Sequence, residues 1–316
     1  MNPAALHTPV LVNEVVQGLE VGPGRRYIDC TVGTGGHARA ILDACSPHGI
    51  LLGIDQDPEA IEVSREVLEE YQDRVTLVQD SFTRLALIAS AYGFESVDGV
   101  LFDLGLSSLQ LERSERGFSF QREGPLDMRM DPSTEIDARR LVNELPEQQL
   151  AEIIARYGEE ARARVIAREI VRQRPIGTTT ELADIVARTK GRRGKLHPAT
   201  KTFQALRIAV NEELDALSAV LPQTLQVLAP GGRLAIITYH SLEDRMVKRF
   251  MVTESRDCIC PPEVPVCQCG HQRALELLAK KPIRPTAAEI SSNPRARSAK
   301  LRISRRVQSR GESGEE

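Results

Sequence analysis

The stretch that decides the fold reads Asp29-Cys30-Thr31-Val32-Gly33-Thr34-Gly35-Gly36-His37. An apolar strand is expected over 26–30 and a helix over 37–44, so this glycine-rich turn joins the two. Glycine lets the backbone approach a ligand closely, and the start of a helix presents unpaired N–H groups. The turn therefore predicts a ligand-binding loop at the carboxyl edge of a parallel sheet.

Apolar strands alternate with helices on either side of this turn. Further strands are expected over 50–55, 75–78 and 97–103, with a helix over 57–71 between the first two. Continuous apolar strands separated by helices are typical of a parallel sheet covered on both faces. A run of helices then follows, and two more strands close the pattern: helices at 137–145, 147–157, 159–174 and 180–190, strands at 233–238 and 300–304.

This order predicts an α/β domain that a helical segment interrupts. We expect a discontinuous α/β domain over 1–112 and 206–316, with a helical insert over 113–205. The chain of 316 residues is 41% hydrophobic and 27% charged, which is ordinary for a globular protein with a sizeable core.

Compartment and membrane association follow from what the composition lacks. The sequence shows no apolar run of the roughly 20 residues that a membrane helix needs, and no basic leader followed by an apolar stretch. Six cysteines in a chain of this length do not make a disulfide scaffold. We therefore expect a cytoplasmic protein with reduced thiols and no membrane contact.

The net charge of −3 hides two basic segments. Residues 161–207 carry a net charge of +9 and residues 280–306 a net charge of +8. Two such blocks on an otherwise acidic chain favour binding of a polyanion, although solvated helix faces would give the same pattern. Aromatic residues make up only 4% and tryptophan is absent, so contact with phosphates is favoured over base stacking.

Acidic residues at strand ends indicate the kind of ligand. Asp55 ends the second strand, where a carboxylate can accept both ribose hydroxyls of a nucleoside cofactor. Asp29 precedes the glycine turn and suits an amino group, whereas it would repel a pyrophosphate. Ala38 stands where the third glycine of the dinucleotide fingerprint would fall. After the third strand, Asp80 could bond an adenine edge and Phe82 could pack on it, or Phe82 is simply a core residue.

Longer motifs resemble the S-adenosylmethionine-dependent (cytosine-N4)-methyltransferase family of bacterial small-subunit ribosomal RNA. The resemblance runs from about His7 to Arg302, with Leu109 standing where the family more often has proline. The matching strings are the glycine turn itself, Asp55-x-Asp57-Pro58, Asp103-Leu104-Gly105-Leu106-Ser107-Ser108-x-Gln110-Leu111, Glu115-Arg116-Gly117-Phe118-Ser119-Phe120, Gly124-Pro125-Leu126-Asp127-Met128-Arg129-Met130-Asp131, His197-Pro198-Ala199-Thr200-x-Thr202-Phe203-Gln204-Ala205, Tyr239-His240-Ser241-Leu242-Glu243-Asp244-Arg245 and Asn293-Pro294-Arg295-Ala296-Arg297-Ser298.

The resemblance implies a fold, a reaction and a partner. The fold is the Rossmann-like class I S-adenosylmethionine methyltransferase sheet, and the reaction is methyl transfer to the exocyclic amine of a decoding-region cytidine at the ribosomal P site. The partner is small-subunit (16S) ribosomal RNA within the small ribosomal subunit, and no protein partner is expected. The implied contacts with the cofactor S-adenosyl-L-methionine are Gly35, Gly36, His37, Asp55, Phe82, Asp103 and Gln110.

Asp103 is the first candidate for a catalytic residue. The exocyclic amine of cytosine is a poor nucleophile, and a carboxylate that accepts its hydrogen bond would stabilise the charge developing on it. Asp103 leaves the fourth strand beside the glycine turn, although a carboxylate there could instead cap the following turn. Weaker candidates are polar loop residues, which are usually solvated or turn-forming, and two histidines, which are more often structural: Ser107, Ser108, Gln110, His197 and His240.

Two loops carry further candidate functions. The basic loop over 190–198 suits phosphate contact, or is simply solvated. The sequence Cys258-x-Cys260 and Cys267-x-Cys269 could hold zinc tetrahedrally, but the usual spacing is Cys-x-x-Cys. The sequence alone therefore favours reduced thiols, and we assign no metal ligand.

Two alternatives of other classes stay open. A nicotinamide dehydrogenase shares the strand, glycine turn and acidic residue, but the sequence offers no hydride-transfer constellation. A non-catalytic, zinc-stabilised RNA-binding ribosome-assembly protein would explain the charge and the cysteines. It would leave the glycine turn and the acids at Asp55 and Asp103 unexplained.

Overall fold

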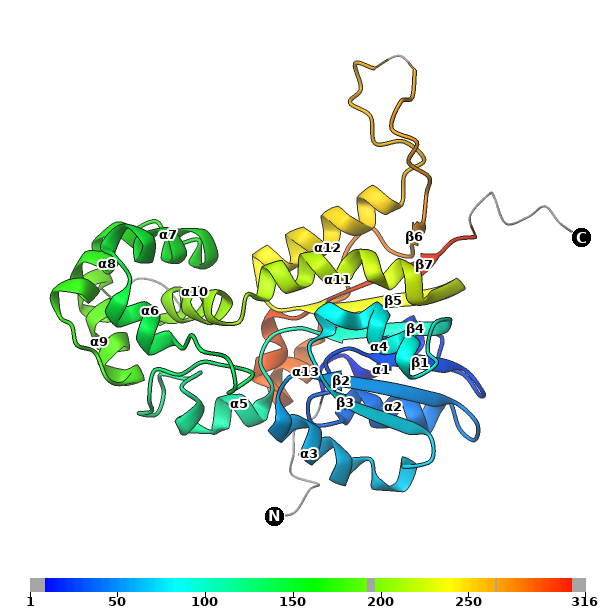
Figure 1. Ribbon diagram of the computed structural model, residues 1–316, viewed down its shortest axis with the longest axis horizontal. Helices are drawn as coiled ribbons and strands as arrows, with labels where there is room; N and C mark the ends of the chain where they lie inside the picture. The colour runs from blue at the N-terminus through cyan, green and yellow to red at the C-terminus, as the bar shows by residue number, and fades with distance from the viewer. Residues whose placement is uncertain (1–8, 192–196, 265, 309–316) are drawn as a thin grey trace, which may run out of the picture. The chain divides into compact units, whose positions relative to one another are not determined.

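The chain folds into two compact units. The computed structural model describes residues 9–191, 197–264 and 266–308 (Figure 1). One unit combines residues 1–105 with 216–316, and the other spans 106–215. The second unit extends beyond the expected insert at both ends, because side chains at 106, 111, 206 and 210 pack into its own core.

The first unit is built on a sheet with the order β3-β2-β1-β4-β5-β7-β6. Five strands run parallel: β1 (Arg26–Asp29), β2 (Ile50–Asp55), β3 (Val75–Gln79), β4 (Val97–Asp103) and β5 (Leu228–Thr238). The antiparallel strand β7 (Lys300–Arg306) pairs with β5 and with the short β6 (Leu275–Leu277), which the sequence pattern did not reveal. In this sheet β2 pairs with one edge of β1, and β4 pairs with its other edge. In parallel sheets such a switch point, at the carboxyl ends of the strands, is the expected place for a ligand.

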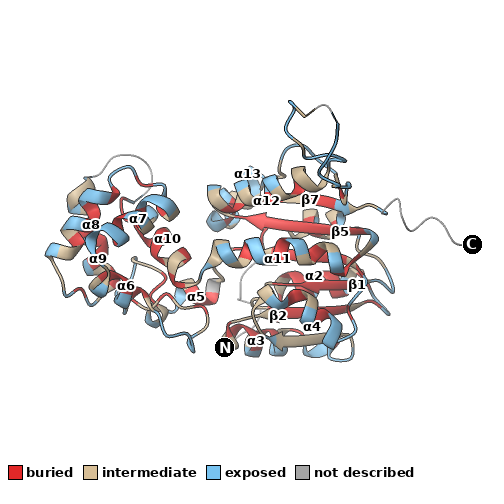
Figure 2. Ribbon diagram, turned by 45° about the horizontal axis from the view of Figure 1, so that its top comes forward, coloured by how far each residue is buried: buried red, intermediate tan, exposed pale blue. Residues whose placement is uncertain are grey.

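Helices cover both faces of this sheet. One face packs against α1 (Val12–Gly18), α2 (Gly36–Ala44) and α3 (Pro58–Val67), and the other against α4 (Leu85–Ala91), α11 (Glu213–Val227) and α12 (Ser241–Glu254). The short α13 (Ala287–Ser292) is tied to the start of α1, since the Leu11 N–H donates to Glu289. Successive strand residues face opposite layers, and the central strands β1, β2 and β4 are largely buried on both faces, whereas β3 at the sheet edge is only partly buried (Figure 2).

The second unit is helical and has a core of its own. Its helices are α5 (Ser108–Glu112), α6 (Ala138–Glu144), α7 (Glu147–Gly158), α8 (Ala163–Arg172), α9 (Thr179–Lys190) and α10 (Thr200–Val210). Leucine, isoleucine and phenylalanine side chains from α6 to α10 meet in that core: Leu141, Leu150, Ile154, Ile166, Ile170, Leu182, Phe203 and Leu206. The unit therefore buries an apolar cluster separate from the two that cover the sheet.

Two expected helices are shorter than the pattern indicated. The helix expected over 57–71 ends at Val67, and a 3₁₀ turn over 69–71 follows it. The helix expected over 159–174 begins only at Ala163, because Glu159 takes a left-handed conformation with φ of 48° that ends α7. Among the described residues, no helix is long and apolar enough to cross a membrane.

Candidate active site

The glycine turn connects β1 to α2 as the sequence predicts. Gly35 precedes the helix in a left-handed conformation with φ of +82°, which favours glycine. A Cβ atom on Gly36 would lie 2.6 Å from Cγ of Pro9, so a larger residue would push the N-terminal segment away. The turn thus exposes the first N–H groups of α2 at the carboxyl edge of the sheet.

His37 lies in the first turn of α2 and is buried, with 6% of its surface exposed. Its Nε2 atom is 2.9 Å from the carbonyl oxygen of Val10. A carbonyl only accepts, so Nε2 carries a proton, and Nδ1 is the atom that faces the Asp103 carboxylate, 3.6 Å from Oδ2. The backbone therefore fixes the orientation of this ring toward Asp103.

Asp103 is the last residue of β4 and contacts side chains from other elements. Its backbone N–H donates to the Thr31 hydroxyl at 2.6 Å, which ties it to the glycine turn. Its Oδ1 atom accepts a hydrogen bond of 2.7 Å from the Tyr239 hydroxyl. The carboxylate is half-buried, with 24% exposed, so it is held on two sides and still reachable. This geometry leaves Asp103 as the leading catalytic candidate.

Tyr239 is the site residue that the sequence interpretation did not single out. It directly follows β5, and burial together with the nearby Asp103 carboxylate raises the pKa of its phenol well above the usual value. The phenol therefore remains protonated and acts as a donor to Asp103. Its position at the carboxyl end of a parallel strand was the available signal.

His240, the next residue, caps α12. Its Nδ1 atom accepts a hydrogen bond from the Glu243 N–H, and the Glu243 carboxylate accepts in return from the His240 N–H. This capping box supports the structural interpretation of His240. In the second unit, the Nδ1 atom of His197 accepts from the Ala199 N–H, and its ring stacks on Phe120, with centroids 4.7 Å apart.

Two carboxylates at the strand ends are buried close to the glycine turn. Asp29 is 1% exposed, and burial raises its pKa to about 7, although His37 and the Thr31 N–H oppose that shift. Burial likewise raises the pKa of Asp55 to about 6. The Asp55 oxygens accept the N–H groups of Gly33 and Asp57 at 2.9 and 3.0 Å, which fixes the carboxylate against the turn. A carboxylate has about four acceptor positions, so Asp55 retains capacity for ligand hydroxyls.

Two residues after β3 have different roles: Phe82 remains a candidate cofactor contact, whereas Asp80 forms a structural ion pair. Phe82 packs edge-on against Phe102, with ring centroids 5.7 Å apart, so its inner side belongs to the core. Asp80 accepts from the Ser81 N–H and pairs with Arg84 at 2.7 Å. The Asp80 carboxylate is therefore engaged within its own turn rather than being held for a base.

Gln110 belongs to the second unit, unlike the other expected cofactor contacts. It is 5% exposed, and its carboxamide oxygen accepts from the Ser107 N–H at 3.2 Å, which completes the capping box of α5. The remaining six expected contacts all come from the first unit: Gly35, Gly36, His37, Asp55, Phe82 and Asp103.

Part of the first basic segment serves the structure of the second unit. Arg174 donates to the carbonyls of Val142 and Leu145 at 2.7 and 2.6 Å. Lys190 and Arg207 are paired with carboxylates in the same unit. Other cations of the segment are exposed: Arg162, Arg164, Arg168, Arg172, Arg188 and Lys201. Most of the basic loop expected over 190–198 lies outside the described residues, at 192–196.

The fold and this site define a Rossmann-like methyltransferase: a glycine turn and an acid at the end of the second strand lie together at the switch point of the sheet. The chain belongs to the MraW methylase family, whose model matches residues 4–307. It is accordingly an enzyme that uses S-adenosylmethionine, and the dehydrogenase hypothesis is wrong.

Relatives of this family match the chain over nearly its whole length. A protein of Thermomicrobium roseum named ribosomal RNA small subunit methyltransferase H is 53% identical over 95% of this chain and 94% of its own. One of Dehalococcoides mccartyi with the same name is 51% identical over 97% of this chain and 88% of its own. The solved structure of an rRNA methylase from Streptococcus thermophilus is 11% identical, with a TM-score of 0.44 over 96% of this chain and 99% of that one.

Proposed function

We propose that this methyltransferase modifies N4 of a cytidine in small-subunit (16S) ribosomal RNA, in the decoding region at the P site. Relatives named as small-subunit rRNA methyltransferases, 51% and 53% identical, support the RNA class. The observation that carries the chemistry is the Asp103 carboxylate, which is held by Tyr239 at 2.7 Å and faced by His37. We place this activity on the small ribosomal subunit in the cytoplasm.

The residues around the glycine turn fit a cationic nucleoside cofactor. Asp29, Asp55 and Asp103 lie near enough that the two other carboxylates help to raise the pKa of Asp29. Such a gathering of acids suits the amino group and sulfonium of S-adenosylmethionine. Gly35 and Gly36 would receive its carboxylate at the start of α2.

The other expected contacts complete this assignment. Asp55 would hold the ribose, and Phe82 and Gln110 would complete the contacts. When bound, S-adenosylmethionine supplies a methyl group on a positively charged sulfur.

Asp103 would act on the amine that is methylated. A hydrogen bond from the N4 amine to this carboxylate would draw electron density toward nitrogen and stabilise the positive charge that grows there. Tyr239 holds the carboxylate through Oδ1, and His37 faces Oδ2. These two contacts orient Asp103 before the base arrives, which is the main contribution that a fixed site makes to an in-line displacement.

The second unit would contact the RNA backbone. The described part of its basic segment has six exposed arginines and lysines, of which Arg168 and Arg172 also pair with glutamates of the same unit: Arg162, Arg164, Arg168, Arg172, Arg188 and Lys201. Cations that neutralise phosphates release counterions, so binding through them weakens as salt rises. The target base must leave its stack to reach Asp103, as in other enzymes that act on a base.

Methyl transfer to unmodified small ribosomal subunits tests this function. Labelled S-adenosylmethionine is supplied with the natural chain, with Asp103→Ala, and with Asp73→Ala as a matched control at an exposed position. We expect label on one cytidine with the natural chain and the control, and little with Asp103→Ala. Equal labelling by all three would overturn the role of Asp103. Cofactor binding without any labelling of the subunit would overturn the proposed substrate.

A further inference from the structure

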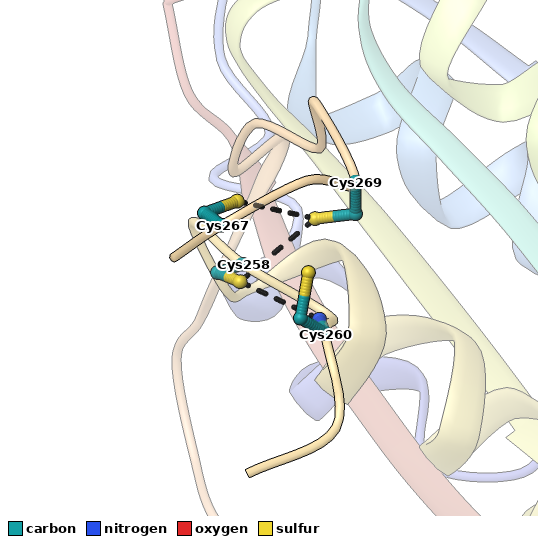
Figure 3. A group of neighbouring side chains, drawn as sticks. All are labelled: Cys258, Cys260, Cys267 and Cys269. Atoms are coloured by element: carbon teal, nitrogen blue, oxygen red, sulfur yellow. Dashed lines mark hydrogen bonds between the residues drawn. The ribbon is translucent and has the colours of Figure 1, made fainter. Parts of the chain in front are cut away.

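The four remaining cysteines converge in one loop of the first unit. The loop joins the end of α12 to β6, and its described residues, 255–264 and 266–274, extend away from the sheet (Figure 1). The Sγ atoms of Cys258, Cys260, Cys267 and Cys269 all lie within 4.8 Å of one another (Figure 3). Each Cys-x-Cys pair thus contributes two sulfurs to one cluster.

The spacing of these sulfurs matches a tetrahedral metal centre. Zinc binds thiolate sulfur at about 2.3 Å, which places the sulfurs of a regular tetrahedron about 3.8 Å apart. The Sγ atom of Cys269 is 3.8 Å from that of Cys258 and 3.5 Å from that of Cys267. These separations are also far longer than the S–S bond of about 2.05 Å in a disulfide.

Backbone N–H groups point at the sulfurs. The N–H of Ile259 donates to Cys269, that of Cys260 to Cys258, and that of Gln268 to Cys260, each at 3.4 Å. Such donors stabilise the negative charge of thiolates and orient them, as second-shell groups do around bound metals.

Packing in a hydrophobic core does not explain why these four cysteines lie together. Cys258, Cys267 and Cys269 are exposed, unlike the core cysteines at positions 30 and 45. Two larger apolar side chains of the loop are also exposed, Ile259 at 46% and Val266 at 70%, and Val264 is half-buried. A segment that buries so little apolar surface needs another source of order, and small structures without a core commonly obtain it from a metal.

The base of the loop is tied to α12. The His271 Nε2 atom lies 3.1 Å from the Thr253 carbonyl, and the Ala274 N–H donates to the Glu254 carbonyl at 2.8 Å. The ends of the loop are therefore held by hydrogen bonds to α12, whereas the described hydrogen bonds of the distal part join the cysteines and their neighbours. A metal at the cluster would close this distal part.

We propose that Cys258, Cys260, Cys267 and Cys269 bind one structural Zn²⁺ ion. Each thiol gives its proton to solvent and forms one sulfur–zinc bond, so the zinc remains divalent and no oxidant is needed. Four protein ligands leave no open position, so the ion orders the loop and takes no part in methyl transfer. The sequence favoured free thiols because one residue separates the cysteines in each pair, whereas the fold brings the two pairs together.

The test measures the metal directly in the full-length protein. The natural chain, Cys258→Ser, Cys267→Ser and the control Gln268→Ser are produced with zinc in the medium, and their zinc is quantified by elemental mass spectrometry. Gln268 lies between two ligands and contributes only its backbone N–H, so its replacement keeps all four thiols. We expect about one zinc per chain in the natural protein and the control, and loss of most of it in both cysteine variants.

Cobalt substitution of the natural chain provides a measurement that does not depend on the variants folding. A tetrahedral tetrathiolate gives intense visible bands and sulfur-to-cobalt charge transfer, and added zinc should abolish them. The proposal is overturned if the natural chain holds no zinc and shows no such bands, or if the cysteine variants keep stoichiometric zinc. It is also overturned if mass spectrometry of the chain shows the loss of two hydrogens for each cysteine pair, which marks disulfides.

Discussion

Removing the hydroxyl of Tyr239 tests whether the Asp103 carboxylate, to which it donates a hydrogen bond, supports methyl transfer. Tyr239→Phe deletes one oxygen and keeps the ring that packs beside Gly105. It removes the 2.7 Å hydrogen bond to Oδ1 of Asp103. The contact of His37 with Oδ2 remains in this variant.

The size of the effect follows from the charge of the acceptor. Hydrogen bonds to charged groups contribute about 1.5–3 kcal/mol. Since about 1.4 kcal/mol corresponds to a tenfold change in rate, kcat should fall by about 10- to 150-fold if this bond matters chiefly in the transition state. The phenol stays protonated because burial and Asp103 raise its pKa well above the usual value, so the donor is present throughout the neutral range.

The assay separates a positioning role from a structural one. Methyl transfer to unmodified small subunits gives kcat and KM, calorimetry gives the affinity for S-adenosylmethionine, and thermal unfolding gives stability. We expect kcat to fall while the other three quantities change little. Tyr92→Phe is the matched control, because Tyr92 is 50% exposed.

Two results would refute this reasoning. An unchanged kcat in Tyr239→Phe would show that the hydrogen bond does not support the reaction. A fall in cofactor affinity and thermal stability as large as the fall in kcat would show that Tyr239 supports the fold rather than Asp103.

Four further variants test burial, the glycine turn and the basic segment. Burial raises the pKa of Asp29 to about 7 in the folded protein. In the unfolded chain an aspartate has a pKa of about 3.9. The folded state therefore binds more protons than the unfolded state between about pH 4 and pH 7. The free energy of unfolding should therefore fall as pH rises from about 4 to about 7, and urea titrations should show a smaller fall in Asp29→Asn. Gly36→Ala places a Cβ 2.6 Å from Pro9 and should lower the free energy of unfolding in urea by about 1–3 kcal/mol. Arg164→Ala should weaken RNA binding and reduce its salt dependence, whereas Arg174→Ala should lower thermal stability.

Each of these expectations has a contrary result. Equal pH dependence in the natural chain and Asp29→Asn would show that this carboxyl does not keep its proton on folding. An unchanged free energy of unfolding in Gly36→Ala would show that the segment at Pro9 moves to accommodate the added methyl group. Equal RNA affinity of Arg164→Ala and the natural chain, at low salt and at high salt, would remove that arginine from the proposed interface.

Local sequence determined the sheet and the turn that begins the site. Strands buried on both faces have nearly continuous apolar runs, so β2, β4 and the middle of β1 stand out without any knowledge of their partners. The turn from Gly33 to Gly36 is equally local, because the left-handed conformations of Gly33 and Gly35 favour glycine. Asp103 was identified because it ends a strand that such a pattern predicts.

Only the tertiary structure decided which distant side chains meet. Tyr239 reaches Asp103 across 136 residues because β4 and β5 pair in parallel, with Asp103 opposite Ile237. Arg174 stabilises the second unit instead of contributing to the proposed RNA-binding surface, because folding brings two backbone carbonyls within hydrogen-bonding distance of it. The four loop cysteines became a candidate metal site for the same reason: one-residue spacings carry little information until two turns face each other. Periodicity and turn chemistry are encoded between neighbours in the chain, whereas contacts between distant residues depend on strand order and register.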